Sequence, residues 1–254
     1  MTGFGPLLRK ELLEQWRTKR LLVVAIVFSV LGIGSPALAR YTPELIQAIG
    51  GLPFEVEFPT PTTRDAVTQF LKNLGQAGIL TAVLLAMGSV ATEKERGTAA
   101  LFLSKPASRA AFLSAKLTAI AATLAIGVLA AAAGGYVYTG LIFETPGILG
   151  WLAMSGLLLL SLLGYTALTF LGSTLTRSAA AAAGIGIGGM IALAIVAVLP
   201  NGAPYTPGGL AGAPAEALAL GRDTGPIIGP VLVNVGLVIG LAVISWLAFR
   251  RQEL

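Results

Sequence analysis

The charged side chains best placed for chemistry lie in one short stretch, ATEKERGTAALFLSKPASR, at residues 91–109. Carboxylates and bases alternate there, between two long apolar runs. Alternating charges can form ion pairs with a second protein surface, although a solvated helix end is the simpler explanation. The candidate contact residues of this stretch are Glu93, Lys94, Glu95, Arg96, Gly97, Thr98, Pro106 and Arg109.

Helix signals within this stretch predict a compact helix–break–helix. Gly97 can adopt the left-handed conformation that ends a helix, and Thr98 can cap the next one. Pro106 pushes the residue before it out of the α region. Ser108 can then cap a further helix that continues through Lys116. A plain connection between two spans needs none of these features, so we expect a docking surface.

The sequence lacks several of the residue types and motifs on which enzymatic catalysis commonly depends. The chain contains no His and no Cys, which excludes Ser-His and Cys-His catalysis, histidine proton relays and thiolate metal sites. No GxxxxGK[ST] phosphate-binding loop occurs either. We therefore expect no catalytic residue, no metal site and no cofactor bound by this chain.

Long apolar segments must position the charged stretch. The 254 residues are 55% hydrophobic and 11% charged, with a mean hydropathy of +0.83, whereas soluble domains carry about 25% charged residues. A helix needs about 20 apolar residues to cross a bilayer. This criterion predicts an all-α integral membrane protein with six transmembrane helices. The predicted spans are 21–39, 74–91, 117–143, 148–175, 178–199 and 227–249.

Basic residues are distributed unevenly among the segments that join the spans. With the N-terminus inside, only Arg40, Arg64, Lys72 and Arg222 of the 17 bases fall outside, which is a positive-inside pattern. It predicts an N-in/C-in orientation and explains the net charge of +5 without a nucleic-acid partner. The joining segments are then a cytoplasmic loop at 92–116 and outside loops at 40–73 and 200–226.

Both outside loops carry helix signals. Thr62 or Thr63 can start a helix with Asp65 in its first turn, and we expect this helix to run into the second span. Residues 213–220 form a short apolar helical patch that is too short to cross the membrane. A plain loop and a re-entrant element both fit this patch.

Residues 1–20 are expected to form an amphipathic elbow helix on the membrane surface, ahead of the six-span domain at 21–254. Leu8, Leu12 and Trp16 recur every four residues on one side, and charged residues occupy the other. Such a helix places its apolar face in lipid and Trp16 at headgroup level. It either anchors the topology or also touches a cytoplasmic partner. Its candidate contact residues are Lys10, Glu11 and Glu14.

Small residues are frequent in the fifth span. Gly184 and Gly188 are spaced as GxxxG, as are Gly236 and Gly240 in the sixth span. Such faces let helix backbones approach closely. They either pack within one subunit or, for Gly184 and Gly188, form the seam of a dimer.

The stretch ATEKERGTAALFLSKPASRAAFLSAK resembles the cytoplasmic loop of ABC-2 type transporter permeases. That loop carries Glu-x-Glu-x-Gly-Thr, Leu-rich residues, Pro-x-x-Arg and a Lys entering the third span. RKELLEQWRTKR is similar to the family's N-terminal elbow, and FRRQEL to its basic C-terminal ending. With the six-span layout, the resemblance covers the whole chain. The matching residues are Glu93, Glu95, Gly97, Thr98, Leu101, Leu103, Pro106, Arg109 and Lys116.

The resemblance implies a transport subunit rather than an enzyme. Two permease copies, as a homodimer or with a related permease, would pair with two copies of a separate ABC ATPase subunit that binds ATP and Mg²⁺. The elbow and the loop around residues 93–109 would be the coupling elements. The implied direction is export across a prokaryotic plasma membrane.

A sodium-coupled carrier or channel without an ATPase is the alternative function. No predicted span contains Asp, Glu, Lys, Arg or His, which argues against a proton-coupled carrier because such residues form proton paths in membranes. Sodium can be coordinated by backbone carbonyls without them. The uncharged spans favour a hydrophobic or amphipathic cargo, and no substrate-binding residue is assigned.

Overall fold

The computed structural model describes residues 3–48, 60–98 and 108–252, and within these ranges every regular element is a helix. The elements are α1 (Phe4–Arg17), α2 (Arg20–Ala48), α3 (Thr63–Met87), α4 (Ala91–Glu95), α6 (Arg109–Ile142), α7 (Ile148–Leu175), α8 (Ala179–Val198), η1 (Ala203–Tyr205), α9 (Pro207–Leu210), α10 (Ala213–Ala219) and α11 (Ile228–Arg250).

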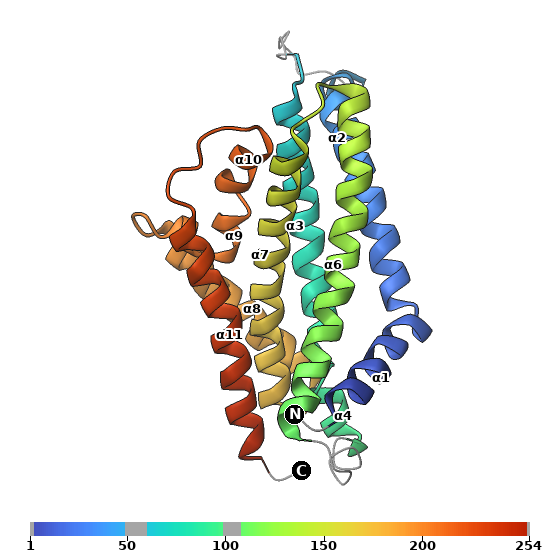
Figure 1. The fold of residues 1–254 in the computed structure, drawn as a ribbon, viewed down its shortest axis with the longest axis vertical. Helices are drawn as coiled ribbons and strands as arrows, with labels where there is room; N and C mark the ends of the chain where they lie inside the picture. Colours follow the sequence, from blue (N-terminus) through green and yellow to red (C-terminus); the bar gives the residue numbers. More distant parts are fainter. Residues whose placement is uncertain (1–2, 49–59, 99–107, 253–254) are drawn as a thin grey trace.

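Six of the described helical segments are long and apolar enough to cross a membrane. They are α2, α3 continued by α4, α6, α7, α8 and α11. The predicted all-α fold class with six spans is thereby confirmed. Helix α1 and the end of α11 lie at the same end of the bundle (Figure 1).

Helices α3 and α6 begin earlier than the predicted spans because local caps start them. Thr62 and Asp65 form a capping box in which Thr62 N donates to Asp65 Oδ2 at 2.8 Å, and α3 begins directly after Thr62. Ser108 Oγ accepts from the Ala111 N–H at 3.1 Å, and α6 begins directly after Ser108. Both predicted helix starts are confirmed.

Helix α2 continues through Pro36 and Pro43 to Ala48, whereas the predicted first span ended at residue 39. Proline is tolerated inside membrane helices where neighbouring helices pack against them, and α2 packs along both α6 and α3. Since α3 already begins at Thr63, much of the segment 40–73, predicted as an outside loop, is helical.

Helix α7 occupies the centre of the bundle, in contact with α3, α6, α8, α10 and α11. Helices α2, α6, α3 and α7 stand side by side in Figure 1, with α8 and α11 on the far side of α7. Of the most apolar 18-residue stretch in each helix, 44% is buried within the chain for α3, α6 and α7, but 11% for α8 and α11. These two helices therefore offer the most surface to lipid or to another subunit.

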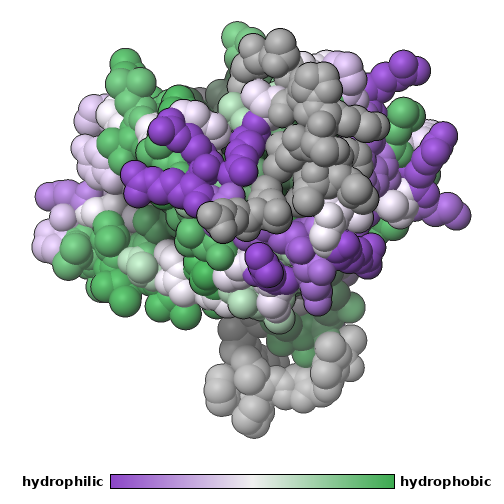
Figure 2. Space-filling view, turned by 90° about the horizontal axis from the view of Figure 1, so that it is seen from below, coloured by the Kyte–Doolittle hydropathy of each residue, from purple (hydrophilic) through white to green (hydrophobic). Residues whose placement is uncertain are grey.

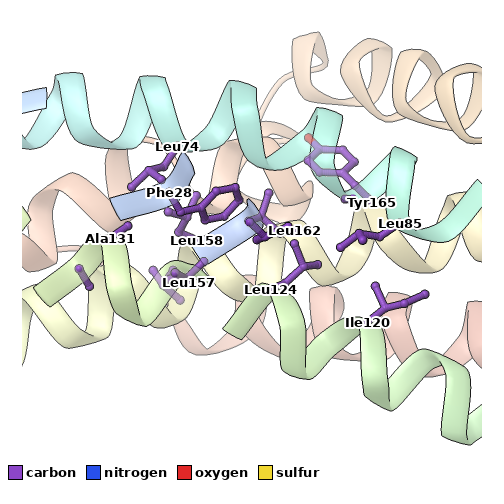
Figure 3. Close-up of a cluster of buried hydrophobic side chains, with 14 of the residues drawn as sticks. Phe28, Leu74, Leu85, Ile120, Leu124, Ala131, Leu157, Leu158, Leu162 and Tyr165 are labelled. Carbon is purple, nitrogen blue, oxygen red and sulfur yellow. The ribbon is translucent and has the colours of Figure 1, made fainter. Parts of the chain in front are cut away.

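Large apolar side chains from four helices meet along the middle of the bundle (Figure 3). Phe28 of α2, Leu74 of α3, Leu124 of α6 and Leu158 of α7 are completely buried. Lipid tails are as apolar as these side chains, so association of membrane helices depends on close packing more than on escape from water.

Helices α2 and α6 approach each other closely at Gly32. A Cβ atom at this position would overlap the backbone of Ala131. The absence of a side chain at Gly32 therefore allows the two helices to touch along their backbones.

The end of the bundle away from α1, which we call the opposite end, carries α10, whereas η1 and α9 lie lower, beside the middle of α7 (Figure 1). Helix α10 packs against α7 and α3 and confirms the predicted helical patch at 213–220. Its Glu216 accepts hydrogen bonds from Arg64 Nε at 2.7 Å and from Thr68 Oγ1 at 3.3 Å. These bonds tie α10 to the first turns of α3.

Candidate functional site

Charged side chains gather where α1 and α4 meet the first turns of α6 and the last turn of α11; we call this the charged end. Seen from this end, the molecule shows hydrophilic side chains on its face and hydrophobic surface on its flanks (Figure 2). Pro106 lies outside the described residues. The other predicted contact residues are Lys10, Glu11 and Glu14 on α1, Glu93, Lys94 and Glu95 on α4, Arg96, Gly97 and Thr98 after it, and Arg109 at the start of α6.

Helix α1 turns polar side chains toward the bundle and apolar ones away from it. Glu11 and Gln15 are 8% and 6% exposed, whereas Leu12 and Trp16 are 36% and 62% exposed. A soluble helix would show the reverse arrangement. This arrangement suits a helix at a bilayer surface, with lipid covering the outward side.

Three carboxylates and two ammonium groups join α1, α4 and α6. We call them the Lys–Glu cluster: Lys10, Glu11, Glu14, Glu93 and Lys116. Lys116 Nζ donates to Glu93 Oε1 at 2.7 Å and to Glu11 Oε1 at 3.0 Å. Lys10 Nζ lies 2.9 Å from Glu11 Oε1 and 3.2 Å from Glu93 Oε1, and it also pairs with Glu14 Oε2 at 3.0 Å. Both lysines thus bridge carboxylates from two separate helices.

Lys116 is the buried centre of this cluster. Its side chain is 3% exposed, and Nζ lies 5.0 Å from the centroid of the Phe112 ring. Removing an ammonium group from water costs roughly several kcal/mol of free energy, as for other buried ions. Two charge-assisted hydrogen bonds and the aromatic face offset this cost.

The outer part of the cluster is also stabilised in its charged form. Desolvation lowers the pKa of Lys10, but the hydrogen bond to Glu11 and the charges of Glu11 and Glu93 together outweigh it and raise that pKa. Desolvation raises the pKa of Glu14, but the hydrogen bond and charge of Lys10, with other nearby cations, lower it overall. Both groups therefore stay charged at neutral pH.

Lys94 and Arg109 face into the protein and hold the end of α11. Arg109 Nη1 donates to the backbone carbonyls of residues 249, 250 and 252 at 2.9, 3.0 and 2.8 Å. Lys94 Nζ donates to Thr174 O at 2.7 Å and to Gln252 Oε1 at 3.0 Å. The last carbonyls of a helix lack intrahelical partners, so Arg109 acts as a cap for α11.

Glu95, Arg96 and Gly97 lie on the surface. Gly97 has a φ of 69° and ends the turn after α4 in the left-handed conformation predicted for it. Thr98 Oγ1 donates to Glu93 O at 3.2 Å, and the helix it was predicted to cap falls outside the described residues. In the described part of the chain, Glu95 and Arg96 therefore present both signs of charge to solvent.

A cavity of about 500 Å³ lies between α1, the end of α3, α4 and the first turns of α6. The Lys–Glu cluster forms part of its lining, together with Arg20 and Arg96. Gln15 Oε1 and Glu93 Oε2 are buried and have no hydrogen-bond partner among the described residues. The cavity is thus polar on the side of α1 and α4.

Glu11, Glu14 and Glu93 each bring a carboxylate oxygen within 4.8 Å of the others, a spacing that could hold a metal ion. However, Lys10 and Lys116 already bind these carboxylates at 2.7–3.2 Å. Ion pairing accounts for the described geometry of the three acids. The expectation of no metal site stays a prediction.

Two further contacts join helices at the charged end. Ser173 Oγ of α7 accepts from Val90 N at 3.0 Å and from Ala91 N at 2.9 Å, at the start of α4. The second is the bridging role of Lys116, which the family resemblance included only as a matching position. A base directly before a long apolar run was the available signal for Lys116, and a hydroxyl inside an apolar span, which favours an interhelical hydrogen bond, was the signal for Ser173.

The glycines of α8 divide between two faces. Gly186 packs against Thr169 of α7, where a Cβ would collide with that side chain. Gly184 and Gly188 have no neighbouring atom within 4 Å of the position a Cβ would take. Contact between α8 and α7 therefore uses Gly186, and a dimer seam at Gly184 and Gly188 stays a prediction.

Comparisons with known proteins agree with this architecture. The chain is 31% identical over 254 residues to YxlG of Bacillus subtilis (strain 168), described as an uncharacterized transmembrane protein, with 97% of each chain covered. Residues 6–205 match the family described as ABC-2 family transporter protein. This match includes most of α1, all of α4, the Lys–Glu cluster and five of the six candidate spans. The chain therefore belongs to the ABC-2 family of transporter proteins, as a multi-pass membrane protein.

Proposed function

We propose that this chain is the permease subunit of an ATP-driven ABC-2 transporter that exports its substrate across a prokaryotic plasma membrane. The family match carries the proposal, since ABC-2 permeases generally pair with ABC ATPase subunits. The chain itself has no phosphate-binding loop. ATP and Mg²⁺ would be bound by two ATPase copies, which would serve two permeases, either a homodimer or a pair with a related permease.

The charged end would face the cytoplasm. Arg9, Arg17, Lys19 and Arg20 are all exposed there, and bases near the ends of spans favour the cytoplasmic side. A cytoplasmic ATPase would then meet α1 and α4 directly.

The outward side of α4 is the surface that best fits an ATPase. Glu95 and Arg96 are exposed and close to the membrane-spanning part of α3, and paired charges of both signs fix orientation more than affinity. ATP binding would close the ATPase pair against α4. Helices α3 and α6, which flank the loop, would carry this movement into the membrane.

Co-purification with an ABC ATPase encoded beside the permease gene tests this surface. The reversal Glu95→Lys/Arg96→Glu preserves net charge and spares the Lys–Glu cluster. It should lower ATPase recovery and ATP-driven transport by about tenfold, since like charges would now face each other. The matched control is Arg222→Glu/Asp223→Lys, an exposed pair at the opposite end, which should change neither measurement.

Reconstituted vesicles test the energy source and the direction. With the charged end outside, accumulation inside the vesicles that requires added ATP and the ATPase is the expected result for an exporter. Transport at full rate by the permease alone, with no nucleotide hydrolysed, would contradict the proposal. That outcome would instead support the sodium-coupled carrier or channel.

A further inference from the structure

Glu11 and Glu93 come from the two segments expected to touch a partner, yet both bind one lysine of α6. Lys116 Nζ lies 3.0 Å from Glu11 Oε1 and 2.7 Å from Glu93 Oε1, and its side chain is 3% exposed. These two acids are therefore joined inside the chain. A role in direct docking is left to residues on the outer side of α4.

Helix α4 is attached to the bundle on two sides. On the α7 side, Ser173 Oγ accepts from Val90 N and Ala91 N, and Lys94 Nζ donates to Thr174 O. On the side of α1 and α6, the polar contacts of α4 within the described residues all pass through Glu93.

Close packing does little to join α4 to α1 and α6. Helix α4 is packed against α7 and α8, and a cavity of about 500 Å³ lies between α4 and the helices that carry Glu11 and Lys116. Buried ion pairs resist separation because each charge left behind would be unpaired. The Lys–Glu cluster thus supplies the described polar link across this gap, in addition to the chain connection from α3 and the direct packing of α1 on α6.

We propose that Lys116 is a positioning residue that makes α1, α4 and the first turns of α6 move as one unit. This inference rests on the proposed function, in which an ATPase pushes on α4. With Lys116 present, displacement of Glu93 pulls directly on α6, the third span. Without it, Ser173 still holds α4 to α7 and Lys10 still joins Glu93 to α1, but no described side chain of α6 binds Glu93. ATP hydrolysis then continues while less of the movement of α4 reaches α6.

The variant Glu11→Gln/Glu93→Gln/Lys116→Met removes the link without leaving a buried unpaired charge, a replacement that proteins often tolerate. ATPase recovery and ATP hydrolysis should stay within about twofold of wild type, while substrate transported per ATP falls by about tenfold, a usual size for coupling between sites. Lys116→Arg keeps the charge and should retain the wild-type ratio. Arg64→Met/Glu216→Gln neutralises an ion pair at the opposite end and serves as the matched control.

Distance measurements test the link independently of any ATPase. The chain has no natural cysteine, so spin labels can be placed specifically at Arg9→Cys on α1 and Glu95→Cys on α4, both exposed positions. We expect one narrow distance distribution in wild type and in Lys116→Arg, and a broad one in the neutral triple variant.

The outcomes separate this inference from the proposed function. Broadened distances together with a lowered transport-to-ATP ratio support it. Unchanged distances in the triple variant overturn it, whatever the transport result. Broadened distances with an unchanged ratio also overturn it and leave the proposed function standing. Wild-type transport that needs no ATP would remove the proposed function and this inference with it.

Discussion

Both ends of the bundle pair a glutamate with a base, but the pairs have different consequences. At the opposite end, Arg64 and Glu216 lie 2.7 Å apart and join α3 to α10, with the Arg64 side chain 59% exposed. At the charged end, Lys116 lies equally close to Glu93 but is 3% exposed, and its cluster joins three helices. Exposed pairs contribute little, whereas a broken buried pair is costly. The contribution of each ion pair to stability therefore depends on its burial and on the number of helices it joins, rather than on the N–O distance.

The largest expected effect comes from Lys116→Met, which leaves Glu11 and Glu93 without their buried partner. We expect a loss of about 3–5 kcal/mol in stability, measured as the drop in thermal unfolding temperature in detergent. The neutral variant Glu11→Gln/Glu93→Gln/Lys116→Met should regain most of that loss. If Lys116→Met unfolds at the wild-type temperature, the buried cluster contributes no more stability than the exposed pair at the opposite end.

A smaller effect is expected for Arg109→Ala, which frees three carbonyls at the end of α11. Hydrogen bonds to a charged group contribute about 2 kcal/mol, so the last turn of α11 should open more often. Trypsin cleavage after Arg250 and Arg251 should accelerate. Arg96→Ala, an exposed arginine nearby, should leave the cleavage rate unchanged; equal acceleration by both variants would argue against the cap.

At the opposite end, Thr62→Ala removes the capping box that starts α3. The loss of such a cap costs about 1 kcal/mol, and the amides of the first turn of α3 should exchange with solvent faster. Thr60→Ala changes an exposed threonine just ahead of the cap and provides the comparison. Identical exchange in both variants would show that Asp65 alone is sufficient to start the helix.

The smallest effect is expected for Arg64→Ala. An exposed ion pair contributes roughly 0.2–1 kcal/mol, and salt should reduce even this. Unfolding temperatures at low and high salt measure both quantities, and the effect of Lys116→Met should change little between the two conditions. If Arg64→Ala loses as much stability as Lys116→Met, and the loss does not depend on salt, the ion pairs at the two ends contribute equally to stability.

Signals that act within a few turns were sufficient to predict most of the fold. Apolar length predicted six spans, Thr62 and Ser108 predicted two helix starts, and Gly97 predicted the end of α4. Apolar length alone placed the end of the first span at residue 39, whereas packing against α6 and α3 carries α2 past Pro43 to Ala48.

The partners of the charged residues could not be predicted in the same way. Alternating charge marked Lys94 and Arg109 as contact residues, but Arg109 bonds a carbonyl 140 positions away and Lys94 a side chain 158 positions away. Charge pattern gives the sign and local face of a side chain, whereas its partner depends on which helices meet. The same reason hid the bridge from Lys116 to Glu11, 105 positions apart.

Helix α7 runs between the two surfaces of the molecule. Its 28 residues contain no proline, and at 1.5 Å per residue they extend about 42 Å. One tip holds α4 through Ser173, and near the other the backbone at Gly150 touches the carbonyl of Leu218 in α10. Helix α7 thus joins α4 at one surface to α10 at the other, by a route that crosses no ion pair.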